Sequence, residues 1–169
     1  MERMSDMASE KAGRVYLVGA GPGGPGLITL RGVECLQRAD FVLYDYLVNS
    51  QILQHARAEA DCICLGHHGG SRIWTQAEIN AKTVALALEG HIVVRLKGGD
   101  PAVFARGAEE VEALVENGIP FEVVPGITAA LAAGSYVGVP LTHRQWSSAV
   151  ALVTGQETRD KTAAGIDYR

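Results

Sequence analysis

Long apolar runs are missing from this sequence of 169 residues. A membrane-spanning helix needs about 18 or more consecutive apolar residues, so we expect no membrane segment. Runs of lysine and arginine are also missing and the net charge is −4, which argues against a nucleic-acid-binding protein. The opening stretch MERMSDMASEKAG lacks the apolar core of a signal peptide. We therefore expect a cytoplasmic protein with a flexible tail over residues 1–13 and a small-molecule partner.

Cysteine is scarce, and the number of cysteines is odd. Cys35, Cys62 and Cys64 cannot all pair, and the further ligands that a zinc site needs are missing around Cys62-x-Cys64. Alternate residues of a strand share one face, so we interpret Cys62 and Cys64 as buried thiols in a strand. We expect no metal site.

Hydrophobic residues make up 47% of the chain, which is ample for one packed core. Short β-branched runs alternate with helix-like stretches, and this alternation predicts an α/β fold with a mostly parallel five-stranded sheet and flanking helices. We expect strands at 14–18, 41–44, 62–65, 92–96 and 121–124. We expect helices at 27–38, 50–56, 75–88, 107–117 and 128–136. Thr75 and Glu78 form a capping-box pattern at the start of one of them.

The loop after the first predicted strand contains Gly19-x-Gly21-x-x-Gly24, which matches the dinucleotide-binding fingerprint. Asp45 lies about where the ribose-binding acid of that motif would be. In the motif the helix begins inside the glycine run, so that its N–H groups face a pyrophosphate. Pro25 is incompatible with such a start, and we expect the helix to begin near 27–29. A flavin- or nicotinamide-dependent oxidoreductase remains one alternative, and a loop in which the glycines only shape the turn is another.

Four longer motifs follow one another along the chain: GAGPG-x-PGLITLRG, ADFVLYDYLV, VVRLKGGDPAVFARGAEE and VPGITAALAAGSYVGVPLTHR. In this order and spacing they resemble the uroporphyrinogen-III C-methyltransferases of the tetrapyrrole methylase family, from about Gly13 to the end of the chain. The KGGDP-x-x-F-x-R-G-x-EE block is the most specific part, because a match of many residues rarely arises by chance. The resemblance implies binding of S-adenosylmethionine between two α/β domains, methylation of uroporphyrinogen III to precorrin-2, and a homodimer.

The same resemblance implies which residues form the site. The cofactor-binding residues would be Pro22, Gly98, Gly99, Asp100, Val103, Thr128 and Ala129. The catalytic residues would be Asp45, His67, Arg106 and Glu109. Asp45 would accept a proton, and His67, where the family has a lysine, would donate one. Arg106 is suited to the substrate carboxylates because a guanidinium binds them bidentately. The segment 97–101 would offer bare backbone groups to the cofactor, and Asp100 would accept from its ammonium group.

Simpler interpretations stay open for several of these residues. Asp45 could be a turn or capping residue, His67 a surface side chain, and Arg106 a partner of Glu110 four positions along one helix. Gly24 stands where the family usually has an aspartate. We expect residues 14–142 to form the N-terminal methylase domain.

Residues 143–169 would be a linker and the first strand, at 148–154, of a truncated second domain. An unpaired apolar strand would favour dimerisation or aggregation. An inactive methylase fragment is therefore a further alternative.

Overall fold

Five parallel strands form the centre of the structure, a computed structural model in which residues 13–66 and 74–155 are described. The strands are β1 (Arg14–Gly19), β2 (Phe41–Tyr44), β3 (Asp61–Cys64), β4 (Ile92–Lys97) and β5 (Phe121–Val124). Their order in the sheet is β3-β2-β4-β1-β5, and each neighbouring pair is parallel. The predicted α/β fold with a parallel five-stranded sheet is confirmed.

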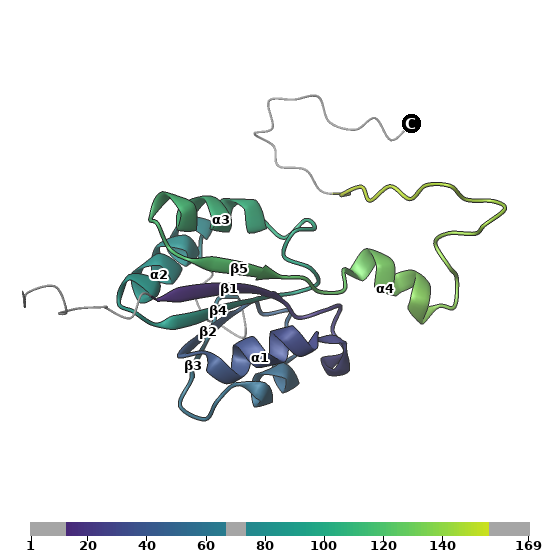
Figure 1. Cartoon of the computed structure of the whole chain (residues 1–169). Coiled ribbons are helices and arrows are strands. Elements are labelled where there is room, and N and C mark those ends of the chain that lie inside the picture. Colours follow the sequence, from purple (N-terminus) through teal and green to yellow (C-terminus); the bar gives the residue numbers. More distant parts are fainter. Residues whose placement is uncertain (1–12, 67–73, 156–169) are drawn as a thin grey trace, which may run out of the picture.

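Helices cover both faces of this sheet (Figure 1). The α-helices are α1 (Leu30–Arg38), α2 (Gln76–Leu88), α3 (Gly107–Glu116) and α4 (Ala129–Tyr136), and the 3-10 helices are η1 (Pro25–Leu27) and η2 (Ser50–His55). In Figure 1, α1 lies on one face while α2 and α3 lie on the other, and α4 lies beyond the end of β5. Within the described ranges, no helix is long and apolar enough to cross a bilayer.

The helix starts follow from capping side chains. The Thr75 side chain accepts a hydrogen bond from the Glu78 amide, and the Glu78 carboxylate accepts one from the Thr75 amide at 2.8 Å. The predicted capping box is therefore confirmed. Thr29 caps α1 by accepting from the Gly32 amide at 3.1 Å, so α1 begins after the glycine run and after the turn η1 at Pro25. This late start is the one that Pro25 predicted.

The alternation of side chains along β4 gives the sheet two different faces. Val94 and Leu96 are fully buried against the α1 side, while Val93 is fully buried against the α2 and α3 side. Burial of each such side chain stabilises the fold by about 1.5–3 kcal/mol. Arg95 and Lys97 alternate with Val94 and Leu96 and so share the face of Val93. This face therefore combines an apolar core with two buried cations.

One expectation at the periphery differs from the structure, and two others are not tested by it. Cys62 is exposed and Cys64 is only half-buried, so the prediction of two buried thiols is wrong; β3 is an edge strand with one neighbour, β2. Cys35, on α1, is the buried thiol. The run 148–154 makes no sheet pairing within the described residues, and Val150, Leu152 and Val153 are exposed. Its assignment as the first strand of a second domain stays a prediction. Of the expected tail over residues 1–13, only Gly13 is described, and it is buried; residues 1–12 and 156–169 lie outside the described residues.

Candidate functional site

A groove of about 550 Å³ opens at the carboxyl ends of β1, β2 and β4, where α4 begins. It is lined by Gly21, Pro22, Asp45, Leu47, Gly98, Gly99, Val103, Phe104, Ala105, Thr128, Ala129 and Ala130. We refer to it as the groove. Ligands of parallel sheets bind in this position, beyond the strand ends where the direction of the connections reverses. The lining comes from loops far apart in the sequence that the sheet order brings together.

Most of the predicted site residues gather in the groove. Its lining includes the predicted proton acceptor Asp45 and six predicted cofactor residues, Pro22, Gly98, Gly99, Val103, Thr128 and Ala129. Asp100, Arg106 and Glu109 are not part of the lining. His67 lies outside the described residues. The roles of all these residues remain predictions, because position in a groove does not test them.

Glycine backbones pack directly against one another below the groove. The Gly21 and Gly99 amides each donate to the carbonyl of the other, at 3.1 and 2.8 Å. A Cβ atom on Gly19 would lie 2.6 Å from the Gly126 Cα, and one on Gly126 would collide with the Gly99 carbonyl oxygen. The backbone groups of Gly99, expected to be free for a cofactor, are thus already bonded to Gly21. What Gly99 contributes is space, because its missing side chain leaves the groove open.

Asp100 holds two loops together. Its Oδ1 accepts from the Ala102 amide at 2.8 Å, and its Oδ2 accepts from the Gly126 amide at 3.0 Å. The loop after β4 is thereby connected to the loop after β5. Each carboxylate oxygen accepts one backbone hydrogen bond, and the expectation that Asp100 also accepts from the cofactor ammonium stays a prediction.

The start of α4 supplies the polar part of the groove. Thr128 is the N-cap residue, yet its side chain makes no capping hydrogen bond. The first backbone N–H groups of a helix have no partner within the helix. Ala129 and Ala130 line the groove at this point, and their small side chains leave the backbone accessible. This end of the groove can therefore donate hydrogen bonds to a ligand.

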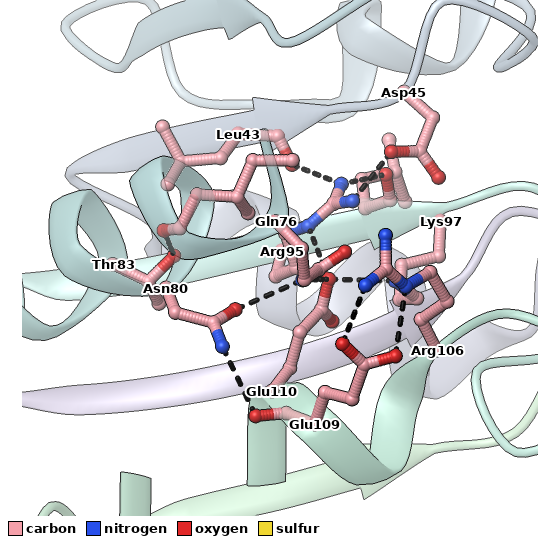
Figure 2. A network of polar contacts seen from close by, with 12 residues as sticks. Leu43, Asp45, Gln76, Asn80, Thr83, Arg95, Lys97, Arg106, Glu109 and Glu110 are labelled. Carbon is pink, nitrogen blue, oxygen red and sulfur yellow. Dashed lines mark hydrogen bonds and ion pairs between the residues drawn. The ribbon is translucent and has the colours of Figure 1, made fainter. Parts of the chain in front are cut away.

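Asp45 is held by a buried arginine (Figure 2). The Arg95 Nη2 donates to the Asp45 Oδ1, and the Arg95 Nη1 donates to the Leu96 carbonyl at 3.2 Å. Arg95 is 3% exposed, whereas the Asp45 side chain is about one third exposed and lines the groove. Among the described residues no hydrogen bond reaches the Asp45 Oδ2. Asp45 thus has one oxygen fixed by Arg95 and one available to a ligand. Its carbonyl also accepts from the Val48 amide at 3.0 Å, so the interpretation as a turn residue stays open.

A second carboxylate, Glu110 on α3, compensates the buried cations. Its Oε1 accepts from the Lys97 Nζ at 2.7 Å and from the Arg95 Nε at 3.1 Å. Glu110 is 6% exposed and Lys97 is 2% exposed. Burial lowers the pKa of Lys97 below 10.5, and the nearby Arg95 charge lowers it further, while Glu110 opposes both effects. The Glu110 Oε2 is buried without a hydrogen-bond partner among the described groups.

The roles of Arg95 and Glu110 were not predicted from the sequence, although a signal exists for both. Charged residues at alternate positions of an otherwise apolar buried strand require a buried counter-charge. Glu110 lies one helical turn before the buried Leu114, on the apolar face of α3. Together these two patterns indicate an ion pair between β4 and α3.

Arg106 pairs with Glu109 and not with Glu110, so the alternative of an Arg106–Glu110 pair is wrong. Its Nε and Nη2 donate to the two Glu109 oxygens at 2.8 and 2.6 Å. This hydrogen bonding raises the pKa of Arg106 and lowers the pKa of Glu109. Both side chains are exposed next to the groove residue Ala105. The pair is accessible to a carboxylate ligand, whereas Glu110 is occupied by the buried cations.

Comparison with known proteins supports the motif-based resemblance. The family model described as Tetrapyrrole (Corrin/Porphyrin) Methylases matches residues 14–167. A siroheme synthase of Blochmanniella pennsylvanica (strain BPEN) is 53% identical over 150 residues, which cover 89% of this chain and 32% of that protein. A uroporphyrinogen-III C-methyltransferase of Priestia megaterium is 52% identical over 149 residues, which cover 88% of this chain and 63% of that protein. The chain therefore spans less than two thirds of these relatives.

A solved structure agrees with both fold and sequence. The uroporphyrin III C-methyltransferase of Thermus thermophilus complexed with S-adenyl homocysteine is 47% identical, with a TM-score of 0.65. The match covers 78% of this chain and 54% of that one. A family model that spans almost the whole chain, relatives above 50% identity and a shared fold lead to one conclusion. The chain belongs to the tetrapyrrole methylase family.

Proposed function

We propose that this chain forms the cofactor-binding part of an S-adenosylmethionine-dependent C-methyltransferase that converts uroporphyrinogen III to precorrin-2. The observation that carries the proposal is the groove, in which Asp45 and six residues implied for cofactor binding lie together. Support also comes from the Priestia relative, a uroporphyrinogen-III C-methyltransferase, and from the Thermus structure complexed with S-adenyl homocysteine. The product would serve tetrapyrrole biosynthesis leading to siroheme or cobalamin.

The groove fits the proposed cofactor. Gly99 and Thr128 line the groove, and a Cβ atom on Gly99 would lie in ordinary contact with the Thr128 Cα at 3.7 Å, so a side chain at this position would narrow the groove. Gly98, Gly99, Thr128 and Ala129 would hold the cofactor, and the start of α4 would donate hydrogen bonds to it. When bound, S-adenosylmethionine supplies an electrophilic methyl group.

Asp45 is the residue that we assign to proton removal from the acceptor carbon. Arg95 fixes the Asp45 Oδ1, which leaves the Oδ2 for the proton. Glu110 accepts from Arg95 on the other side of the network, and Lys97 in turn donates to Glu110. Arg106, exposed beside the groove, would bind a substrate carboxylate in place of, or together with, Glu109.

The oxidoreductase alternative is less well supported. A dinucleotide site needs a helix that begins within Gly19-x-Gly21-x-x-Gly24, but α1 begins at Leu30 behind the turn η1. The pyrophosphate would therefore lack the N–H donors of a helix start. We further propose that the protein acts in the cytoplasm, consistent with its three free cysteines, and that it forms a homodimer.

Calorimetric titration of the chain with S-adenosylhomocysteine, NADH and FAD tests the proposal. We expect binding of S-adenosylhomocysteine alone; binding of NADH or FAD without it would favour the oxidoreductase. Gly99→Ala should weaken S-adenosylhomocysteine binding by about tenfold or more, because the added methyl group enters the groove. Gly118→Ala is the matched control: Gly118 has nearly the same backbone strain, with a φ of 64° against 68°, and lies away from the groove.

A methyl-transfer assay with uroporphyrinogen III tests the role of Asp45. Asp45→Asn keeps the shape of the side chain but removes its basicity. We expect it to retain S-adenosylhomocysteine binding and to lose about 100-fold or more in turnover. Measurable wild-type turnover that Asp45→Asn retains in full would exclude Asp45 as the proton acceptor.

A further inference from the structure

The loop between β4 and α3 contains unusual backbone geometry. Phe104 and Arg106 have φ values of 50° and 56°, and they are the non-glycine residues with positive φ in the described part of the chain. A left-handed conformation is a genuine outlier for a bulky residue such as phenylalanine. Residues held in this way cluster at functional sites, where the surrounding structure maintains the strain. The position of Phe104 therefore needs an explanation.

The surroundings of the loop show how the strain is maintained. Asp100 accepts from the Ala102 amide at the start of the loop. At its end Gly107 packs so closely on Pro101 that a Cβ atom on Gly107 would collide with the Pro101 carbonyl oxygen. Both ends of the loop are thus fixed, and the chain between them must bulge outwards through Phe104.

The conformation does not serve the hydrophobic core. Phe104 is 62% exposed, and it lines the groove between Val103 and Ala105. Leu47, a second exposed apolar residue of the groove, follows β2, the strand next to β4. Asp45 lines the same groove two residues before Leu47. Two exposed apolar side chains therefore lie in the same groove as the carboxylate to which we assign proton removal.

We propose that Phe104 positions the substrate by packing its ring against a pyrrole ring of the tetrapyrrole acceptor, with Leu47 as a further contact. This inference rests on the proposed function. Aromatic rings attract one another in offset or edge-to-face contacts. The exposed Arg106, two residues further on, can bind a carboxylate of the same ligand. The adenine ring of the cofactor is the other aromatic partner, and the binding measurements below distinguish the two.

Binding measurements on the whole chain show whether Phe104 contacts the tetrapyrrole or the cofactor. The probes are uroporphyrin III, the stable fluorescent oxidised analogue of the substrate, and S-adenosylhomocysteine. Phe104→Gly removes the ring and relieves the positive φ, since glycine adopts this conformation readily. We expect thermal stability to stay unchanged or to rise, while uroporphyrin III affinity falls about fivefold or more. Phe104→Tyr should retain affinity within about twofold, because the aromatic ring is kept.

Leu88→Ala is a control, because Leu88 is 65% exposed at the end of α2 and lies outside the groove. Leu88→Ala should change neither the affinity for uroporphyrin III nor the affinity for S-adenosylhomocysteine. S-adenosylhomocysteine binding should be unchanged in every Phe104 variant. Wild-type affinity of Phe104→Gly for uroporphyrin III would overturn the inference, and a parallel loss of S-adenosylhomocysteine binding would assign the ring to the cofactor instead. A wild-type chain that binds neither probe would refute the proposed function and this inference with it.

Discussion

Glu110→Gln is the change that most directly tests the buried network. Glu110 is 6% exposed and compensates two cations, Lys97 at 2.7 Å and Arg95 at 3.1 Å. Glutamine has nearly the same shape but no charge, so it would leave these cations with only Asp45 as a counter-charge. Removing one partner of a buried ion pair typically costs about 3–5 kcal/mol. For a domain of this size we expect the melting temperature to fall by roughly 6–20 °C.

The loss of stability caused by Glu110→Gln should become smaller as the pH rises. Burial already lowers the pKa of Lys97 in the folded protein, and the two effects of Glu110 that raise it disappear in the variant. Between the folded pKa and the unfolded value near 10.5, the unfolded chain binds more protons, so stability rises with pH. The destabilisation caused by Glu110→Gln is therefore fully present while Lys97 is protonated, and it decreases as Lys97 loses its proton. The stability difference between wild type and Glu110→Gln should shrink towards alkaline pH.

Urea unfolding of both proteins at several pH values measures this difference. Glu109→Gln is the matched control, because the neighbouring Glu109 makes an exposed ion pair with Arg106 that contributes little to stability. Lys97→Met in the Glu110→Gln background should recover part of the loss by removing an uncompensated cation. Equal stability of the Glu110 and Glu109 variants, or a difference that grows at alkaline pH, would contradict the role of Glu110 as the counter-charge of Lys97 and Arg95.

Three further predictions concern other parts of the chain. Thr75→Ala removes the capping box of α2 and should lower the free energy of unfolding by about 1 kcal/mol in urea titrations. Gly24→Asp introduces the residue that is usual in the family. Gly24 has an ordinary backbone conformation (φ −70°, ψ 125°), and the added Cβ would lie 3.2 Å from the Tyr136 hydroxyl. We therefore expect calorimetry to show a change in the free energy of unfolding within about 0.5 kcal/mol. Truncation after Thr142 removes the exposed Trp146 and Leu152 and should reduce self-association in light scattering; a monodisperse monomer of the intact chain would contradict this.

Local sequence patterns predict much of this fold. The run at 92–96 indicates a buried strand because it is apolar apart from Arg95 and is followed by a glycine turn, and the strand extends only one residue further, to Lys97. Pro25 correctly predicts a late start of α1, since proline cannot fit the early hydrogen bonds of a helix that starts within the glycine run. The order of the strands is not local information, because pairing joins residues far apart in sequence, such as Val15 with both Val93 and Phe121.

The candidate site was predictable to a smaller extent. Motifs identified Pro22, Gly99 and Thr128 as neighbours, and the structure places them in one groove. Motifs did not indicate that the Gly99 backbone is bonded to Gly21, because hydrogen-bond partners depend on how the loops meet. The left-handed conformation of Phe104 has no local signal either, since phenylalanine rarely adopts it and the surrounding loop imposes it.

The close packing of Gly19, Gly99 and Gly126 has a consequence for how this protein can change by mutation. Every amino acid other than glycine carries a Cβ atom, so every missense change at Gly19 or Gly126 places an atom inside the backbone of a neighbouring loop. No smaller replacement exists, and a compensating change elsewhere would have to move a main chain and not a side chain. Random mutagenesis should therefore yield almost no viable substitutions at Gly19 and Gly126. The rim of the groove is formed by side chains, so it can vary and thereby change which acceptor is bound.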